Sequence, residues 1–179
     1  MTSQITVPTP PTTHEALVAR GGTVVASSPV ERAELLDATS WAMRHSWSDL
    51  QGLARHLRRY HFAAGQAVFR EGDHDAFLAI VAGGELEILK ADRAEHCRVV
   101  ARVGVGKMVG EMSLVDGAAR SATAVTSVPT DLLVLSREDF RHLCQASPEL
   151  GVTLTLAIAT AIAQLLRQTT GNLIDHLGS

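Results

Sequence analysis

Beyond Ala64-Gly65 the hydrophobic positions of the chain repeat every second residue or form short aliphatic runs. A period of two is typical of β-strands. Turn residues such as Gly72-Asp73 and Gly83-Gly84 separate these runs. Several short strands at this spacing predict an antiparallel sandwich or barrel rather than βαβ units. The expected strands lie in the segments AVFREGD, AFLAIVAGGELEIL, CRVVARV, SATAVT and DLLVLS.

Helical spacing of the hydrophobic residues flanks this region on both sides. Residues 31–47 have a helical pattern, and Ser48-Asp49-Leu50-Gln51 matches a capping box that would open a short helix through Arg59. After the strands, Ser136 is expected to cap one helix, and Pro148 opens a long last helix that we expect to reach about Thr170. The predicted order is helix, small β-barrel and two helices.

The pattern divides the chain into one domain and two extensions. Residues 1–30 are rich in Thr, Pro and Ser without apolar periodicity, which predicts a flexible N-terminal arm. Residues 31–170 are expected to form a single domain that includes the C-terminal helix. Gly171 interrupts the last helical pattern, so residues 171–179 are expected to be a tail.

Composition narrows the class of protein. The 179 residues carry a net charge of −3, so no overall basic field indicates a nucleic acid or an anionic membrane as partner. Cys97 and Cys144 are far apart and form no CxxC motif, which favours a reducing compartment, and we expect a cytoplasmic protein without a signal peptide. The longest uncharged run, Leu150 to Leu166, is shorter than the roughly 20 residues of a membrane span, and we expect a buried or dimerising helix there.

The segment GEMSLVDGAARSATA, residues 110–124, is too small and polar to be core. Its expected helical turn leaves backbone N–H groups free to bind an anion, and Arg120 could bind the same anion with two parallel hydrogen bonds. Glu111 would accept from hydroxyl groups and repel a highly charged anion. Together they favour a ligand with one negative charge beside a sugar hydroxyl, which describes a cyclic phosphodiester on a ribose but not a nucleoside triphosphate. The alternative is a surface ion pair between Glu111 and Arg120.

The longer stretch VGVGKMVGEMSLVDGAARSATAV resembles the phosphate-binding cassette of the cyclic nucleotide-binding domain family, which includes the catabolite activator, kinase regulatory subunits and cyclic-nucleotide-gated channels. The segments FAAGQAVFREGD, FLAIVAGGELEIL and DLLVLSREDFRHL resemble other strands and the following helix of that family. The resemblance covers about Ser48 to Leu166. It implies a mainly β fold, an antiparallel β jelly-roll barrel with an N-terminal helix and C-terminal helices.

The resemblance also implies a role for individual residues. Glu111 would accept from the ribose 2′-hydroxyl, and Arg120 would bind the cyclic phosphate. Ala119 stands where the family often has Pro, which should leave the loop less rigid. The residues expected to bind the ligand are Gly110, Glu111, Met112, Ser113, Arg120, Ser121 and Ala122.

The identity of the base is less constrained. A hydroxyl residue after the arginine can favour guanine in this family, but Ser121 also fits adenine. We therefore expect cyclic AMP, with cyclic GMP as the alternative. From its position on the last helix, Arg167 is a possible base contact, as are the neighbouring Gln168 and Thr169.

Two other classes of protein fit the sequence less well. A jelly-roll metalloenzyme of the cupin type needs a close His-x-His pair, and the eight histidines form none. A degenerate barrel that serves only as an interaction scaffold would not need both Glu111 and Arg120. Only twelve residues follow Arg167, so we expect no helix-turn-helix module and no direct DNA binding. The expected protein is a sensor without catalytic activity that acts through an unknown effector protein or a homodimer.

The last helix offers the surface for such a homodimer. Leu154, Ile158, Ile162 and Leu165 form one apolar stripe that is expected to pack on the barrel. Further apolar residues lie outside this stripe and predict a second covered face, which we expect to be the dimer interface. These are Leu150, Val152, Ala157 and Ala161.

Overall fold

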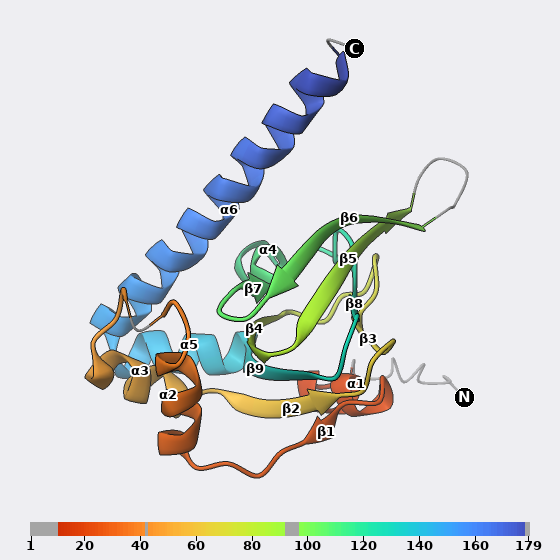
Figure 1. The fold of residues 1–179 in the computed structure, drawn as a ribbon. Helices are drawn as coiled ribbons and strands as arrows, with labels where there is room; N and C mark the ends of the chain where they lie inside the picture. The colour runs from red at the N-terminus through yellow and green to blue at the C-terminus, as the bar shows by residue number, and fades with distance from the viewer. Residues whose placement is uncertain (1–10, 42, 92–96, 178–179) are drawn as a thin grey trace, which may run out of the picture.

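The computed structural model describes residues 11–41, 43–91 and 97–177, which form two antiparallel sheets with helices around them (Figure 1). The first sheet contains, in spatial order, β1 (Thr23–Val24), β2 (Arg58–Phe62), β9 (Thr130–Ser136), β4 (Phe77–Gly83) and β7 (Met108–Val109). The second contains β3 (Ala67–Phe69), β8 (Thr123–Thr126), β5 (Glu85–Ala91) and β6 (Cys97–Gly104). The predicted fold class, an antiparallel jelly roll with flanking helices, is confirmed.

Strand β4 explains how the two hydrophobic cores are arranged. Phe77, Ala79 and Val81 belong to the core that both sheets share, whereas Leu78 and Ile80 belong to a second core between the five-stranded sheet and the helices. Successive side chains of a strand point to opposite faces, so both faces of β4 are covered. This is why its sequence is a continuous apolar run rather than an alternating one.

The helices are α1 (Thr13–Ala19), α2 (Pro29–Asp37), α3 (Trp47–Ala54), α4 (Glu111–Asp116), α5 (Arg137–Ala146) and α6 (Pro148–Leu177). Residues of α2, α3, α5 and the first turns of α6 enclose the second core. The later part of α6 extends away from this group as a long rod (Figure 1). Its residues 164–170 are all exposed.

The N-terminal segment differs from the prediction of a flexible arm over residues 1–30. A capping box of Thr12 and Glu15 opens α1, and Leu17 is fully buried in the core between the sheets. β1 then pairs with β2, and Ser28 caps α2. The prediction is wrong for this part because one buried leucine and a two-residue strand leave no period in the sequence. Residues 1–10 of the predicted arm lie outside the described residues.

The predicted helix from Ser48 to Arg59 is placed two residues too late and extended too far. Ser46, with Asp49, makes the capping box of α3, which ends at Ala54. Arg59 lies in β2 rather than on a helix face, and its Nη2 atom is 2.9 Å from Asp131 Oδ2. The error arises because two overlapping segments, Ser46 to Asp49 and Ser48 to Gln51, both resemble a capping box.

The last helix is longer than predicted. Ser136 caps α5 as expected, and α6 begins at Pro148, but it continues through Gly171 to Leu177 instead of giving way to a tail. A glycine inside a helix costs about 1 kcal/mol and does not by itself end the helix. By length and composition alone, Pro148–Thr170 could span a membrane, although core helices of soluble proteins meet the same test.

Candidate functional site

A cavity of about 760 Å³ lies between the β5–β6 strands, α4 and α6. All seven residues that the sequence singled out for ligand binding, from Gly110 to Ala122, line it. Arg167 is not among the lining residues, but Gln168 and Thr169 are, together with Gln164 and Leu165 of α6. The seven predicted residues therefore line one cavity together with these α6 residues, whereas Arg167 does not line it.

Gly110 is placed where only glycine fits. It has a φ of 80° and immediately precedes α4. A Cβ atom there would overlap Arg120 Nη1 and lie 2.6 Å from the Phe77 carbonyl oxygen. The close approach lets the Gly110 carbonyl accept a hydrogen bond of 3.1 Å from Arg120 Nη1. Gly110 therefore both turns the chain into α4 and holds the arginine.

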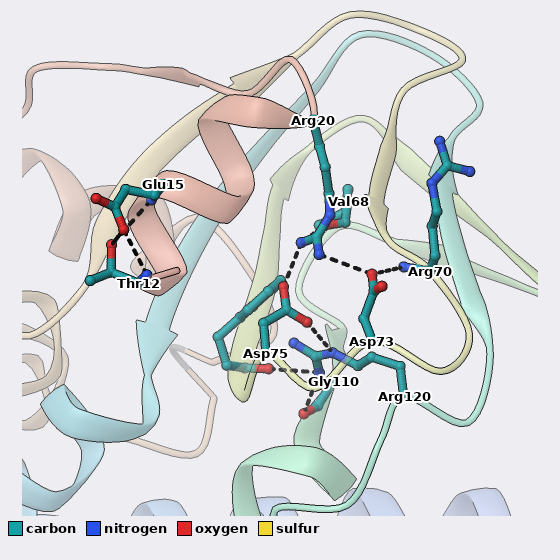
Figure 2. Close-up of polar contacts among 10 residues, drawn as sticks. Thr12, Glu15, Arg20, Val68, Arg70, Asp73, Asp75, Gly110 and Arg120 are labelled. Carbon is teal, nitrogen blue, oxygen red and sulfur yellow. Dashed lines mark hydrogen bonds and ion pairs between the residues drawn. The ribbon is translucent and has the colours of Figure 1, made fainter. Parts of the chain in front are cut away.

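Arg120 is a buried cation with 2% of its surface exposed. Its guanidinium carbon lies 4.2 Å from the ring centroids of both Phe69 and Phe77, and Nη1 also donates to the Phe77 carbonyl at 3.0 Å. Nε contacts Asp75 Oδ1 at 3.4 Å, as Figure 2 shows. Burial lowers the pKa of Arg120, and Asp75 opposes that shift, but a guanidinium remains charged. Within the described part of the chain, its buried Nη2 atom has no hydrogen-bond acceptor.

Glu111, the first residue of α4, is also buried, with 9% of its surface exposed. Burial raises the pKa of its carboxyl group, while its own backbone N–H and Arg120 act in the opposite direction. Among the ion pairs of residues 11–41, 43–91 and 97–177, Glu111 and Arg120 are not joined. The alternative of a surface ion pair is therefore wrong, since both groups are buried.

Three further groups at the site were not predicted from the sequence. The Lys90 ammonium donates to the Ser121 carbonyl and is 2.7 Å from Glu71 Oε1. Trp41 and His45 stack with ring centroids 4.9 Å apart, and Trp41 Nε1 donates to the Gly106 carbonyl at 3.1 Å. Lys90, Trp41 and His45 line the cavity. Only tertiary contacts bring them there, so local sequence pattern carries no signal for them.

Within residues 11–41, 43–91 and 97–177, no three His, Cys, Asp or Glu side chains are grouped closely enough to hold a metal ion.

The model of the cyclic nucleotide-binding domain matches residues 59–147, which include α4, Glu111 and Arg120. This part of the chain belongs to the cyclic nucleotide-binding domain family. The solved cyclic nucleotide-binding domain of Methylobacillus flagellatus has the same fold, with a TM-score of 0.79 and 25% identity over 91% of this chain and 96% of that one. The family resemblance expected from the cassette is thereby confirmed.

Curated relatives place this cyclic nucleotide-binding domain in larger proteins. The cyclic AMP receptor protein of Thermus thermophilus is 32% identical over 109 residues, which are 61% of this chain and 50% of the relative. A lysophospholipase of Chaetomium globosum is 29% identical over 103 residues, 58% of this chain and 7% of the enzyme. The chain spans half or less of these relatives, so the shared unit is the binding domain and not their whole activity.

Proposed function

We propose that this domain binds a cyclic mononucleotide in the cavity beside α4, with cyclic AMP as the expected ligand and cyclic GMP as the alternative. The observation that carries the proposal is the buried Arg120, whose Nη2 donor has no acceptor among the described residues although the residue lines a cavity. Buried donors normally have acceptors. An oxygen of a cyclic phosphate would supply one, in a charge-assisted hydrogen bond.

The sugar and the base have candidate partners on the same cavity. The buried Glu111 carboxylate is an acceptor for a ribose 2′-hydroxyl, and the α4 residues Met112 and Ser113 would offer backbone N–H groups to the phosphate. Arg167 remains a proposed base contact, but Gln168 and Thr169 are better placed because they line the cavity. One buried cation beside one buried carboxylate favours a singly charged ligand with a free hydroxyl group.

We further propose that the output passes through a homodimer along α6. Leu154 and Ile158 are buried in the second core, and Leu150 and Ala157 pack against it, so these residues are not free for a partner. A different stripe remains exposed, with alternating spacings of four and three residues that are typical of a coiled-coil seam. It consists of Val152, Leu156, Ala159, Ala163 and Leu166, of which Val152, Leu156 and Leu166 are at least 60% exposed and Ala163 is half-buried.

The ligand would act by favouring one position of α6, because α6 residues and the proposed phosphate-binding residues line the same cavity. A ligand shifts such an equilibrium only as far as it binds the two positions with different affinity. A cytoplasmic effector protein that recognises the shifted helix is the second route by which binding could be transmitted.

Calorimetry with the purified chain and cyclic AMP, cyclic GMP and linear 5′-AMP tests the proposed ligand. We expect saturable binding of a cyclic nucleotide, and Arg120→Ala should weaken it by about 2–5 kcal/mol because a buried anion loses its counter-charge. Arg70→Ala is the matched control, since this exposed arginine lies in the neighbouring turn. Unchanged binding by folded Arg120→Ala, verified by circular dichroism, would show that the site is wrongly assigned.

A further inference from the structure

Arg20 connects the N-terminal helix to the turn that follows β3. It is the C-cap residue of α1, and its side chain is 19% exposed. Its Nη2 atom lies 2.9 Å from Asp73 Oδ2, and its Nη1 atom lies 2.5 Å from Asp75 Oδ2 and donates to the Val68 carbonyl at 3.2 Å. Figure 2 shows both aspartates between Arg20 and Arg120.

The turn after β3, residues 70–75, contacts both the backbone and the side chain of Arg120. The Arg120 N–H donates to the Asp73 carbonyl at 2.8 Å, and the Gly72 N–H donates to the Arg120 carbonyl at 2.9 Å. Asp75 presents one carboxylate oxygen to Arg120 and the other to Arg20. The two arginines therefore share one carboxylate, and Arg20 acts on the phosphate-binding arginine without touching the cavity.

The helix that carries Arg20 is fixed to the domain. Leu17 is fully buried between the sheets, and His14 Nδ1 is 2.9 Å from the Tyr60 hydroxyl. After Arg20, the chain turns at Gly21, which has a φ of 96°, and the Gly22 N–H donates to the Leu17 carbonyl. Arg20 is thus held in place by packing that does not depend on its own ion pairs.

Arg20, Asp73, Asp75 and Arg120 form a charged cluster, and its net charge affects how strongly Arg120 can bind an anion. Asp73 and Asp75 balance Arg20 and Arg120, so the cluster is neutral before a ligand arrives. Without Arg20 the cluster would carry one net negative charge. Asp75 would then pair with Arg120 only, and the carboxylates of Asp73 and Asp75 would repel an incoming phosphodiester.

We propose that Arg20 is a positioning residue for the ligand: its one positive charge offsets one of the two negative charges of Asp73 and Asp75, so that Arg120 balances only the other and stays available to the phosphate. This inference rests on the proposed function, since it concerns the affinity of the same site. Through Arg20, the helix α1 would contribute to the affinity of the binding site.

The test compares cyclic AMP affinity in the full chain and in variants that change the charge of the cluster. Arg20→Gln should weaken binding on the order of tenfold, because the uncompensated carboxylates oppose the anion. Arg20→Lys, which keeps the charge, should bind within a few-fold of the parent. Arg20→Gln combined with Asp73→Asn restores neutrality and should recover most of the affinity.

These outcomes separate the electrostatic role from a structural one and from failure of the proposed function. If the role of Arg20 were purely structural, adding Asp73→Asn to Arg20→Gln would not improve binding, because that change replaces none of the lost contacts of the guanidinium. This result would overturn the inference, as would unchanged binding in Arg20→Gln. If the parent chain binds neither cyclic AMP nor cyclic GMP, the proposed function itself fails. Thermal unfolding of each variant verifies that α1 remains packed.

Discussion

Glu111 places a carboxyl group in a buried position at the start of α4. Its pKa is raised above the ordinary 4.5, with burial as the main cause. Below the unfolded-state value both states are protonated, so the group costs nothing. As the pH rises from about 4.5 through the folded-state pKa, the unfolded chain loses its proton first and the folded state loses stability. At neutral pH, Glu111 therefore lowers the free energy of unfolding.

We predict that Glu111→Gln stabilises the chain without ligand, and more at pH 7 than at pH 4. Urea unfolding at the two pH values measures the difference, with Glu34→Gln on the exposed side of α2 as the control. The same variant should lose about 1.5–3 kcal/mol of affinity for a ribose ligand and less for its 2′-deoxy analogue. A stability gain that does not depend on pH would argue against burial of the charge as its cause.

Gly110 and Gly65 form a matched pair for testing the close approach to Arg120. Their φ angles are 80° and 79°, so an alanine at either position pays the left-handed backbone cost of about 1–2 kcal/mol. A Cβ atom at Gly65 meets nothing within 4 Å, whereas at Gly110 it overlaps Arg120.

We predict that Gly65→Ala lowers stability but keeps ligand affinity, and that Gly110→Ala loses at least tenfold in affinity as well because Arg120 is displaced. Chemical denaturation and calorimetry on the two variants measure both effects. Equal affinity in the two variants would mean that the Gly110–Arg120 contact does not position the arginine.

At the scale of elements, the helices and strands differ in how well the local sequence pattern predicts them. The strands are predictable because each combines alternating or continuous apolar residues with a turn at its end, as in β4 and β9. The loop from Gly110 to Ala122 is predictable because its residues act within one short segment. By contrast, Leu17 and Arg20 hold α1 through contacts with residues far away in the sequence. Asp75 likewise contacts Arg120 only because the fold brings the residues before β4 next to the loop from Gly110 to Ala122.

The exposed stripe on the long helix α6 is the proposed dimer interface. Leu156 and Leu166 lie ten residues apart on the exposed stripe, so glutamates there would repel each other across a symmetric interface. We expect light scattering to show a dimer for the parent chain at tens of micromolar and a monomer for Leu156→Glu with Leu166→Glu. Ile158 is unsuitable for this test because it is buried in the core.

A monomeric parent, both with and without cyclic nucleotide, would end the proposal of a dimer. A dimer that survives the two glutamate substitutions would place the interface on another surface of the molecule.

At the scale of the whole molecule, segments far apart in the sequence converge on one cavity. The loop with Trp41 and His45 contributes from the N-terminal side, the segment with Glu111 and Arg120 from the middle, and Gln168 from the C-terminal helix. Through Arg20, α1 reaches the same arginine from outside the cavity. The cavity is therefore lined by segments outside residues 59–147, the part of the chain that the family model matches, as well as by segments within it.

The pairing of β1 with β2 has a consequence for solubility. The five-stranded sheet ends in a two-residue strand on each side, β1 at one edge and β7 at the other. β1 covers the backbone of β2 opposite Tyr60 and His61, and the Val25 N–H donates to the Arg59 carbonyl. An uncovered strand of this length is a template for edge-to-edge aggregation. The short N-terminal segment thus protects the sheet from self-association, and a chain shortened past Val25 would expose that edge to other copies.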